Sequence, residues 1–162
     1  MSPVYISDTN IWIDFRNAGL LDSLFSLPFH FCSTDFVIAE LEDFNPGELI
    51  AKGLIVMPMN ERQIRELGHL TLEHNNSSLA DVSCYLLARE CGHPLLTGDG
   101  RLRKQASKDG LRVHGALWLL DQLLVAGIIK NLRAHEALSF MLKANARLPK
   151  NECEARLAAW QG

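Results

Sequence analysis

The sequence predicts an α/β protein whose small, mostly parallel sheet is sandwiched between helices. Short apolar segments of strand type alternate along the chain with longer segments whose apolar residues recur at helical spacing. A strand that returns parallel to its predecessor needs a crossover, and a helix is the usual one, so this alternation indicates a parallel sheet with helices on both faces. The predicted strand at residues 94–97 begins with an unbroken apolar run, as expected for a strand buried on both faces.

The order of elements follows from this alternation. The predicted strands are residues 4–7, 29–33, 54–57, 94–97 and 111–114, of which the last is the weakest. The predicted helices are residues 10–17, 20–26, 35–44, 61–73, 79–91, 101–108, 116–126, 131–146 and 152–160. Pro149 separates the last two helices.

The chain has the length of one ordinary domain. Its 162 residues, 48% of them apolar and 22% charged, exclude a disordered or low-complexity protein. We expect a domain over residues 1–130 and a helical C-terminal extension over residues 131–162 that packs on the same domain. No apolar stretch approaches the ~20 residues of a membrane span. No basic leader precedes Asp8, so we expect a cytoplasmic protein.

Composition also limits the chemistry of the protein. The four cysteines form no Cys-x-x-Cys pair and the six histidines form no His-x-x-x-His pair, which argues against a dedicated zinc site. The formal net charge is −3, whereas proteins that bind nucleic acid through bulk charge are usually basic. A role with nucleic acid therefore needs a local basic patch or a bound cation.

Two carboxylates follow predicted strands. Asp8 comes directly after the first strand and Asp99 follows the fourth. Ligand sites in open α/β sheets lie outside the carboxyl ends of the strands, so both acids are candidates for function. Each also has a structural interpretation, because Asp8 can cap the first helix and Asp99, in a Gly-Asp-Gly turn, can cap another. Asn10 and Thr97 would add polar groups at the same edge.

Asp81 lies on a predicted helix that is apolar nearly all round. It shares a face with Cys84, Tyr85 and Ala88, and a buried carboxylate is costly unless a cation compensates it. Alternatively, Ser78 caps this helix and Asp81 in the first turn favours the positive end of the helix dipole.

A fourth carboxylate lies near the end of the predicted helix at residues 35–44. Periodicity alone does not choose among Glu40, Glu42 and Asp43. Phe36 and Phe44 lie four residues to either side of Glu40, which favours Glu40 as the acid that turns inward.

Four carboxylates that converged on one edge would repel one another unless a divalent cation lay among them. Ligands that are all oxygen indicate Mg²⁺ or Mn²⁺. Such ions activate water for phosphodiester hydrolysis and neutralise charge on the phosphate. An acidic site can then hold an anionic substrate.

The motifs that carry these residues are residues 6–14 (ISDTNIWID), 37–41 (VIAEL), 79–83 (LADVS) and 96–102 (LTGDGRL). These segments, in this order, resemble the PIN-domain ribonucleases, among them the toxins of VapBC-type toxin-antitoxin pairs. The resemblance covers about residues 4–127, so the C-terminal helices exceed a minimal domain of this kind.

The resemblance implies a PIN-like fold and an endoribonuclease that hydrolyses phosphodiester bonds of single-stranded or structured RNA. By the resemblance, Asp8, Glu40, Asp81 and Asp99 would be the catalytic and metal-binding residues, for Mg²⁺ or Mn²⁺. Asn10 and Thr97 would be the polar residues that accompany them. It also implies an antitoxin protein as a possible partner. Asp14 matches a frequent acidic position, which we interpret as a helix-surface residue facing Arg16.

A basic helix follows Asp99. Arg101, Arg103, Lys104 and Lys108 would lie beside the proposed site and could contact RNA phosphates. The alternative is an ordinary solvated helix face.

Two other function classes remain open. A non-catalytic RNA-binding or protein-binding module could use the same fold, although all four carboxylates are present. A phosphatase similar to the haloacid dehalogenases would need Asp-x-Asp after the first strand, and the sequence there is Asp8-Thr9-Asn10.

The C-terminal half holds many apolar residues for a small domain: Trp118, Leu119, Leu123, Leu124, Ile128, Ile129, Leu138, Phe140, Met141, Leu142, Leu148, Leu157 and Trp160. Those that remained exposed would form a protein interface, either of a homodimer or with an antitoxin. Alternatively, these helices pack back on the sheet and leave a monomer.

Overall fold

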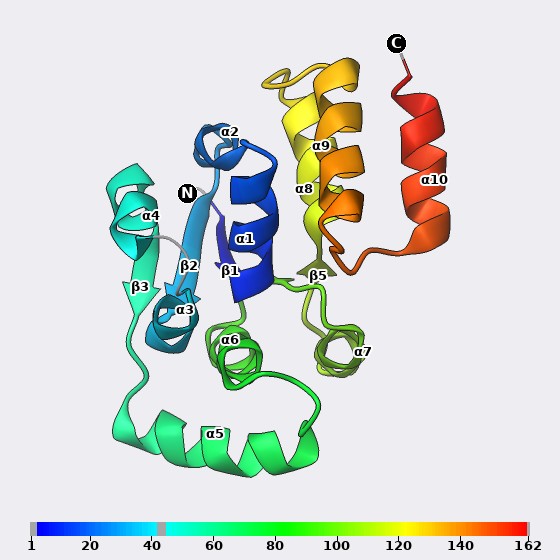
Figure 1. The fold of residues 1–162 in the computed structure, drawn as a ribbon. Helices are drawn as coiled ribbons and strands as arrows, with labels where there is room; N and C mark the ends of the chain where they lie inside the picture. The colour runs from blue at the N-terminus through cyan, green and yellow to red at the C-terminus, as the bar shows by residue number, and fades with distance from the viewer. Residues whose placement is uncertain (1–2, 42–44, 162) are drawn as a thin grey trace.

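The computed structural model describes residues 3–41 and 45–161, and within them the chain builds one parallel sheet (Figure 1). The strands are β1 (Val4–Ser7), β2 (His30–Thr34), β3 (Ile55–Met57), β4 (Leu95–Leu96) and β5 (Val113–His114). Their spatial order is β3-β2-β1-β4-β5, and every neighbouring pair is parallel. The prediction of an α/β fold with a parallel sheet is confirmed.

Helices cover both faces of this sheet. They are α1 (Thr9–Asn17), α2 (Leu21–Phe25), α3 (Asp35–Glu40), α4 (Pro46–Lys52), α5 (Glu61–Glu73), α6 (Leu79–Cys91), α7 (Gly100–Lys108), α8 (Ala116–Val125), α9 (Asn131–Lys143) and α10 (Lys150–Ala159). Helix α6 packs on β1, β2 and β4, with α3, α5 and α7 beside it. Helices α1, α2, α8, α9 and α10 make the other layer (Figure 1).

Helix α4 is not predicted by the sequence pattern. Its start is a capped turn in which the Asn45 side chain accepts a hydrogen bond from the amide of Gly47, and Pro46 occupies the first helical turn. An Asn-Pro-Gly sequence is as typical of a loop as of a helix start, so the local signal is ambiguous. The predicted helix at 35–44 is also too long, because α3 ends at Glu40; residues 42–44 lie outside the described residues.

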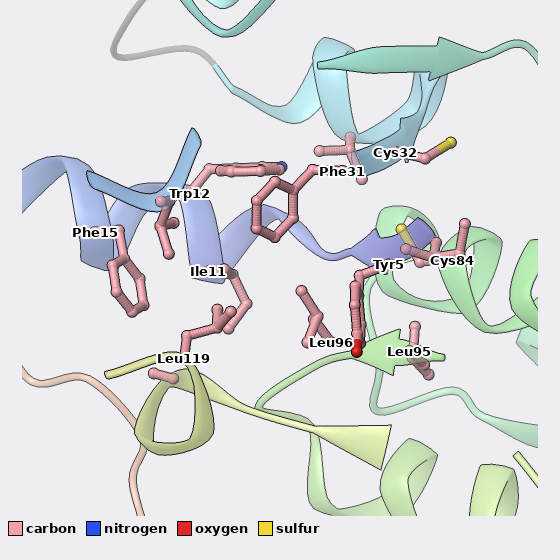
Figure 2. Close-up of a cluster of buried hydrophobic side chains, with 14 of the residues drawn as sticks. Tyr5, Ile11, Trp12, Phe15, Phe31, Cys32, Cys84, Leu95, Leu96 and Leu119 are labelled. Carbon is pink, nitrogen blue, oxygen red and sulfur yellow. The ribbon is translucent and has the colours of Figure 1, made fainter. Parts of the chain in front are cut away.

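A buried aromatic cluster fixes α1 on the sheet. Trp12 and Phe31 are almost fully buried and meet edge to face, with ring centroids 5.5 Å apart (Figure 2). The Trp12 indole donates to Ser33 Oγ at 2.9 Å, and Ser33 Oγ donates to the carbonyl of Ser7 at 2.7 Å. The indole of Trp12 and the hydroxyl of Ser33 are therefore both hydrogen-bonded, as buried donors normally are. The first helix therefore begins at a fixed position immediately after β1.

The C-terminal helices pack on the rest of the chain. Helix α9 contacts α1 and α8, and α10 contacts α9. Of the thirteen apolar residues singled out from the sequence, six are buried: Leu119, Leu123, Ile129, Leu138, Met141 and Trp160. Six are half-buried against the core: Trp118, Leu124, Ile128, Leu142, Leu148 and Leu157. Phe140 is the exposed one, at 50%.

No helix within residues 3–41 and 45–161 has both the length and the apolar character needed to cross a membrane.

Candidate active site

A cleft of about 450 Å³ opens at the carboxyl edge of the sheet. Acidic residues from three helices line it, namely Asp14 of α1, Glu40 of α3 and Asp81 of α6, together with Asp99 before α7. Asn10 lies on the same wall, and residues 144–148, which connect α9 to α10, form the opposite part of the lining. The edge that the sequence predicted for a ligand site is therefore hollowed and acidic.

Asp8 lies buried between β1 and α1, beneath this cleft. One carboxylate oxygen caps α1 by accepting from the amide of Ile11 at 3.0 Å. The other accepts from Thr97 Oγ1 at 2.8 Å and from the amide of Gly98 at 3.3 Å. Burial nevertheless raises the pKa of Asp8 above its ordinary value, and the nearby charge of Asp99 adds to this rise. The capping role predicted for Asp8 is confirmed, and the carboxylate is fully buried beside a second acid, Asp99.

Asp99 has the second predicted capping role. Its Oδ1 accepts from the amides of Arg101 and Leu102 at the start of α7, and its Oδ2 accepts from Ser77 Oγ at 2.5 Å. Thr97 connects this acid to Asp8, because Thr97 Oγ1 donates to Asp8 and accepts from the amide of Asp99 at 3.1 Å. The neighbouring ends of β1 and β4 thus bring two carboxylates close together.

Asp81 is buried at the start of α6. Ser78 caps this helix by accepting from the Asp81 amide at 3.0 Å, as one reading of the sequence predicted. Asp81 is only 7% exposed to solvent. Its Oδ1 is buried and has no hydrogen-bond partner in the described part of the chain. Burial, followed by the charges of Asp8, Glu40 and Asp99, raises the pKa of Asp81 to about 7.

Glu40 lies at the rim of the cleft. It is the last residue of α3 and its side chain is exposed, so it is not buried between aromatic residues, although it does face the cleft. It still lines the cleft, because α3 ends there and the C-terminal position faces Asp81 closely enough to raise the pKa of that carboxyl. Glu42, Asp43 and Phe44 lie outside the described residues.

Asp14 is a site residue that the sequence interpretation missed. It is half-buried and lines the cleft instead of standing on an outer helix surface. Burial, with a contribution from the charge of Asp8, raises the pKa of Asp14 to about 6. A sequence signal was present, because Asn10 and Asp14 are four residues apart and so share a helix face.

The described carboxylates do not form a complete metal-coordination site. In the part of the chain that the structure describes, no group of three or more His, Cys, Asp or Glu side chains has an arrangement that could hold a metal ion. The donor chemistry does fit a hard divalent cation, because the set is all oxygen and because burial and neighbouring carboxylates raise the pKa of Asp8 and of Asp81. Asp81 Oδ1 is buried without a hydrogen-bond partner, and a bound cation would compensate its charge.

The four basic residues predicted to contact RNA do not lie in one place. Arg103 and Lys104 line a second pocket next to the acidic cleft, while Lys108 lines neither. Arg101 lies at the side chain of Asn76, whose oxygen accepts from the guanidinium when the amide is oriented to satisfy both groups. Arg147, which lines both the cleft and the pocket, has no counterpart among the expected site residues.

Comparison with known proteins gives two positive findings. A family model described as a PIN domain (DUF3368) matches residues 4–161, a range that includes α9 and α10. A solved structure of a PilT N-terminus domain protein from the hyperthermophilic archaeon Sulfolobus solfataricus P2 has a TM-score of 0.51 and 14% identity; the alignment covers 75% of this chain and 93% of that one. At this identity the likeness concerns the fold. No curated protein matches the sequence.

Proposed function

This chain belongs to the PIN-domain family, whose members are generally nucleases, and from that premise we propose that it is a divalent-metal-dependent endoribonuclease. The observation that carries the proposal is the buried carboxylate of Asp81, whose Oδ1 has no hydrogen-bond partner in the described part of the chain and whose pKa is raised by burial and by the charges of Asp8, Glu40 and Asp99. Single-stranded or structured RNA is the proposed substrate, and we expect the enzyme to act in the cytoplasm.

The residues proposed to hold Mg²⁺ or Mn²⁺ are Asp8, Glu40, Asp81 and Asp99. A cation bound there would neutralise charge on the scissile phosphate and lower the pKa of a water molecule for attack on phosphorus. The protein's own part is to position the ligands: Thr97 aligns Asp8 with Asp99, and the helix starts at α6 and α7 fix Asp81 and Asp99. Asn10 contributes a polar group at the mouth of the cleft.

The Glu40→Gln variant tests this proposal. Because Glu40 is exposed at the rim, its replacement should leave the fold intact while lowering Mn²⁺-dependent cleavage of single-stranded RNA by about two orders of magnitude. The measurement is single-turnover cleavage of a labelled RNA with Mn²⁺ and with EDTA. Glu73→Gln is the matched control, since Glu73 is an exposed residue at the end of α5 that does not line the cleft. Equal activity of the two variants would show that Glu40 is not needed for cleavage.

A non-catalytic RNA-binding module is the second candidate, and one observation favours it: among the described residues, no three His, Cys, Asp or Glu side chains are arranged to hold a metal ion. The two functions differ in one measurement. If the parent protein binds RNA but neither binds Mn²⁺ in calorimetric titration nor cleaves RNA when Mn²⁺ is supplied, the module replaces the nuclease.

We also propose that the exposed apolar residues of the C-terminal layer bind a protein, either a second copy of the chain or, if the chain is a toxin, its antitoxin. Val125, Leu132 and Phe140 are 83%, 61% and 50% exposed. The expected result is a dimer in sedimentation velocity at micromolar concentration, which Leu132→Glu converts to a monomer. Leu72→Glu is the control, because Leu72 is 79% exposed on α5 and should not affect association. A parent that stays monomeric contradicts the homodimer.

A further inference from the structure

A second pocket, of about 680 Å³, lies beside the acidic cleft. Helix α7 contributes Arg103 and Lys104 to its lining, β5 and the start of α8 contribute His114 and Trp118, and the connection from α9 to α10 contributes Arg147. None of these residues belongs to the carboxylate set, and the proposed reaction does not use the pocket.

The pocket is cationic. Its Arg156 is paired with Asp121 at 2.7 Å, so that charge is already balanced. Lys104 and Arg147 have no ion pair within residues 3–41 and 45–161, and Glu152 is the acid in the lining. The remaining positive charge is available for an anion.

Arg103, which lines the pocket, contacts the residue that follows β4. Its guanidinium donates to the carbonyl of Thr97 at 3.4 Å, the residue whose hydroxyl donates to Asp8. The guanidinium of Arg103 packs against the backbone of Gly115, which has no side chain. A Cβ at position 115 would lie 2.8 Å from Arg103 Nη1. One residue at the end of β4 thus contacts both the acidic site and the basic pocket.

The pocket also has an aromatic wall. The rings of His114 and Trp118 stack with centroids 4.0 Å apart and an interplanar angle of 11°. Burial, together with the charges of Arg112 and Arg103, lowers the pKa of His114 below its ordinary value, so the imidazole is neutral near pH 7. His114 therefore provides ring surface and no charge, and such a surface suits a base, because every base has a π-face that can stack.

The pocket continues into the cleft. Gly98, Ala116, Arg147 and Leu148 line both. We propose that the pocket is a nucleotide subsite: it binds one ribonucleotide that adjoins the scissile phosphate, with Lys104 and Arg147 on the phosphates and the base against the aromatic wall. The inference rests on the proposed ribonuclease function, since it is the acidic cleft that would hold the scissile phosphate.

The first test measures binding without cleavage. A short, fluorescein-labelled single-stranded RNA of mixed sequence is titrated with protein in EDTA, and anisotropy is followed at several salt concentrations. The double variant K104Q/R147Q should bind about tenfold more weakly, and its plot of log affinity against log salt should be shallower by about 1.4, or 0.7 for each lost phosphate contact. The double variant R65Q/K130Q is the control, because it removes the same charge from exposed positions on α5 and before α9.

The second test isolates the base. H114L keeps an apolar side chain at the wall but removes the ring, so affinity should fall several-fold while the salt slope stays as in the parent. Thermal unfolding of each variant verifies that the fold is retained. The inference is overturned if K104Q/R147Q binds like the parent, if R65Q/K130Q weakens binding equally, or if H114L binds like the parent.

These outcomes are independent of the cleavage assay. If the variants behave as expected but the parent never cleaves RNA with Mn²⁺, the subsite stands as an RNA-binding site and the nuclease proposal fails. If the parent cleaves RNA but none of the pocket variants alters binding, the nuclease proposal stands and the subsite is overturned.

Discussion

The Asp8→Asn variant is expected to lose RNA cleavage by about a thousandfold or more while remaining folded. An Asn side chain keeps the oxygen that caps α1 through the amide of Ile11, but it presents an NH₂ group to the amide of Gly98 and carries no charge. Losing one carboxylate from a four-acid metal site removes several kcal/mol of charge stabilisation, and each 1.36 kcal/mol is a factor of ten in rate. Asp99→Asn should behave in the same way, since Asp99 also combines a cap with a site carboxylate.

Two measurements examine this result. Calorimetric titration should show weakened Mn²⁺ binding for both variants, and single-turnover assays should show the loss of cleavage at saturating RNA. Asp22→Asn provides the control, because the Asp22 side chain is 87% exposed and does not line the cleft. If Mn²⁺ bound to Asp8→Asn as tightly as to the parent, Asp8 would not be a metal ligand.

The second large effect concerns stability, and it has the opposite sign. The Asp81→Asn variant should be more stable than the parent at pH 8 in EDTA, by on the order of 2 kcal/mol. The folded protein holds the Asp81 proton more tightly than the unfolded chain does, because burial and neighbouring carboxylates raise the pKa of Asp81 from its ordinary value of 3.8 to about 7. Between pH 4 and about pH 7 the native state therefore binds more protons than the unfolded state, and the stability of the parent falls as pH rises through this window.

Urea unfolding in EDTA at pH 5 and at pH 8 measures this effect. The parent should lose stability between the two pH values, and Asp81→Asn should lose less, although Asp14, with a pKa raised to about 6, keeps part of the dependence in both proteins. Saturating Mn²⁺ should reverse the ranking at pH 8, because a ligand that binds the native state stabilises the parent alone. A variant less stable than the parent at pH 8 in EDTA would show that the Asp81 charge is already compensated within the fold.

Much of the fold can be predicted from local sequence, because capping residues mark where several helices begin. The side chains of Asp8, Ser78 and Asp99 each cap a helix, and each follows an apolar segment or opens one. Helices α5 and α6 have the predicted bounds, since a capping residue and a strong apolar face define each of them. Helix α4 is missed, because an Asn-Pro-Gly start has the same composition as a loop.

The candidate site is predictable only in the part that strand ends determine. Asp8 and Asp99 follow strands, and the edge of a parallel sheet brings such residues together whatever the rest of the chain does. Asp14 and Arg147 depend on tertiary packing: Asp14 lines the cleft because α1 is held by Trp12, and Arg147 reaches it because α9 packs on α1. No pattern near residue 147 indicates that the chain returns to the acidic edge.

The connection from α9 to α10 also divides the cleft into two walls of different origin. One wall consists of strand ends and helix starts, whose side chains cap helices and meet the core, so a change there disturbs the fold. The other consists of residues 144–148, where Asn145 has a φ of 64° and Ala144 and Arg147 are exposed. Substitutions at the exposed Ala144 and Arg147 cost little packing, whereas Leu148 packs against the core. Under the proposed function, changes at those two exposed positions would alter which RNA sequence fits without altering the chemistry. Exchanging residues 144 and 147 among members of the family therefore tests whether this connection sets the sequence preference of the proposed enzyme.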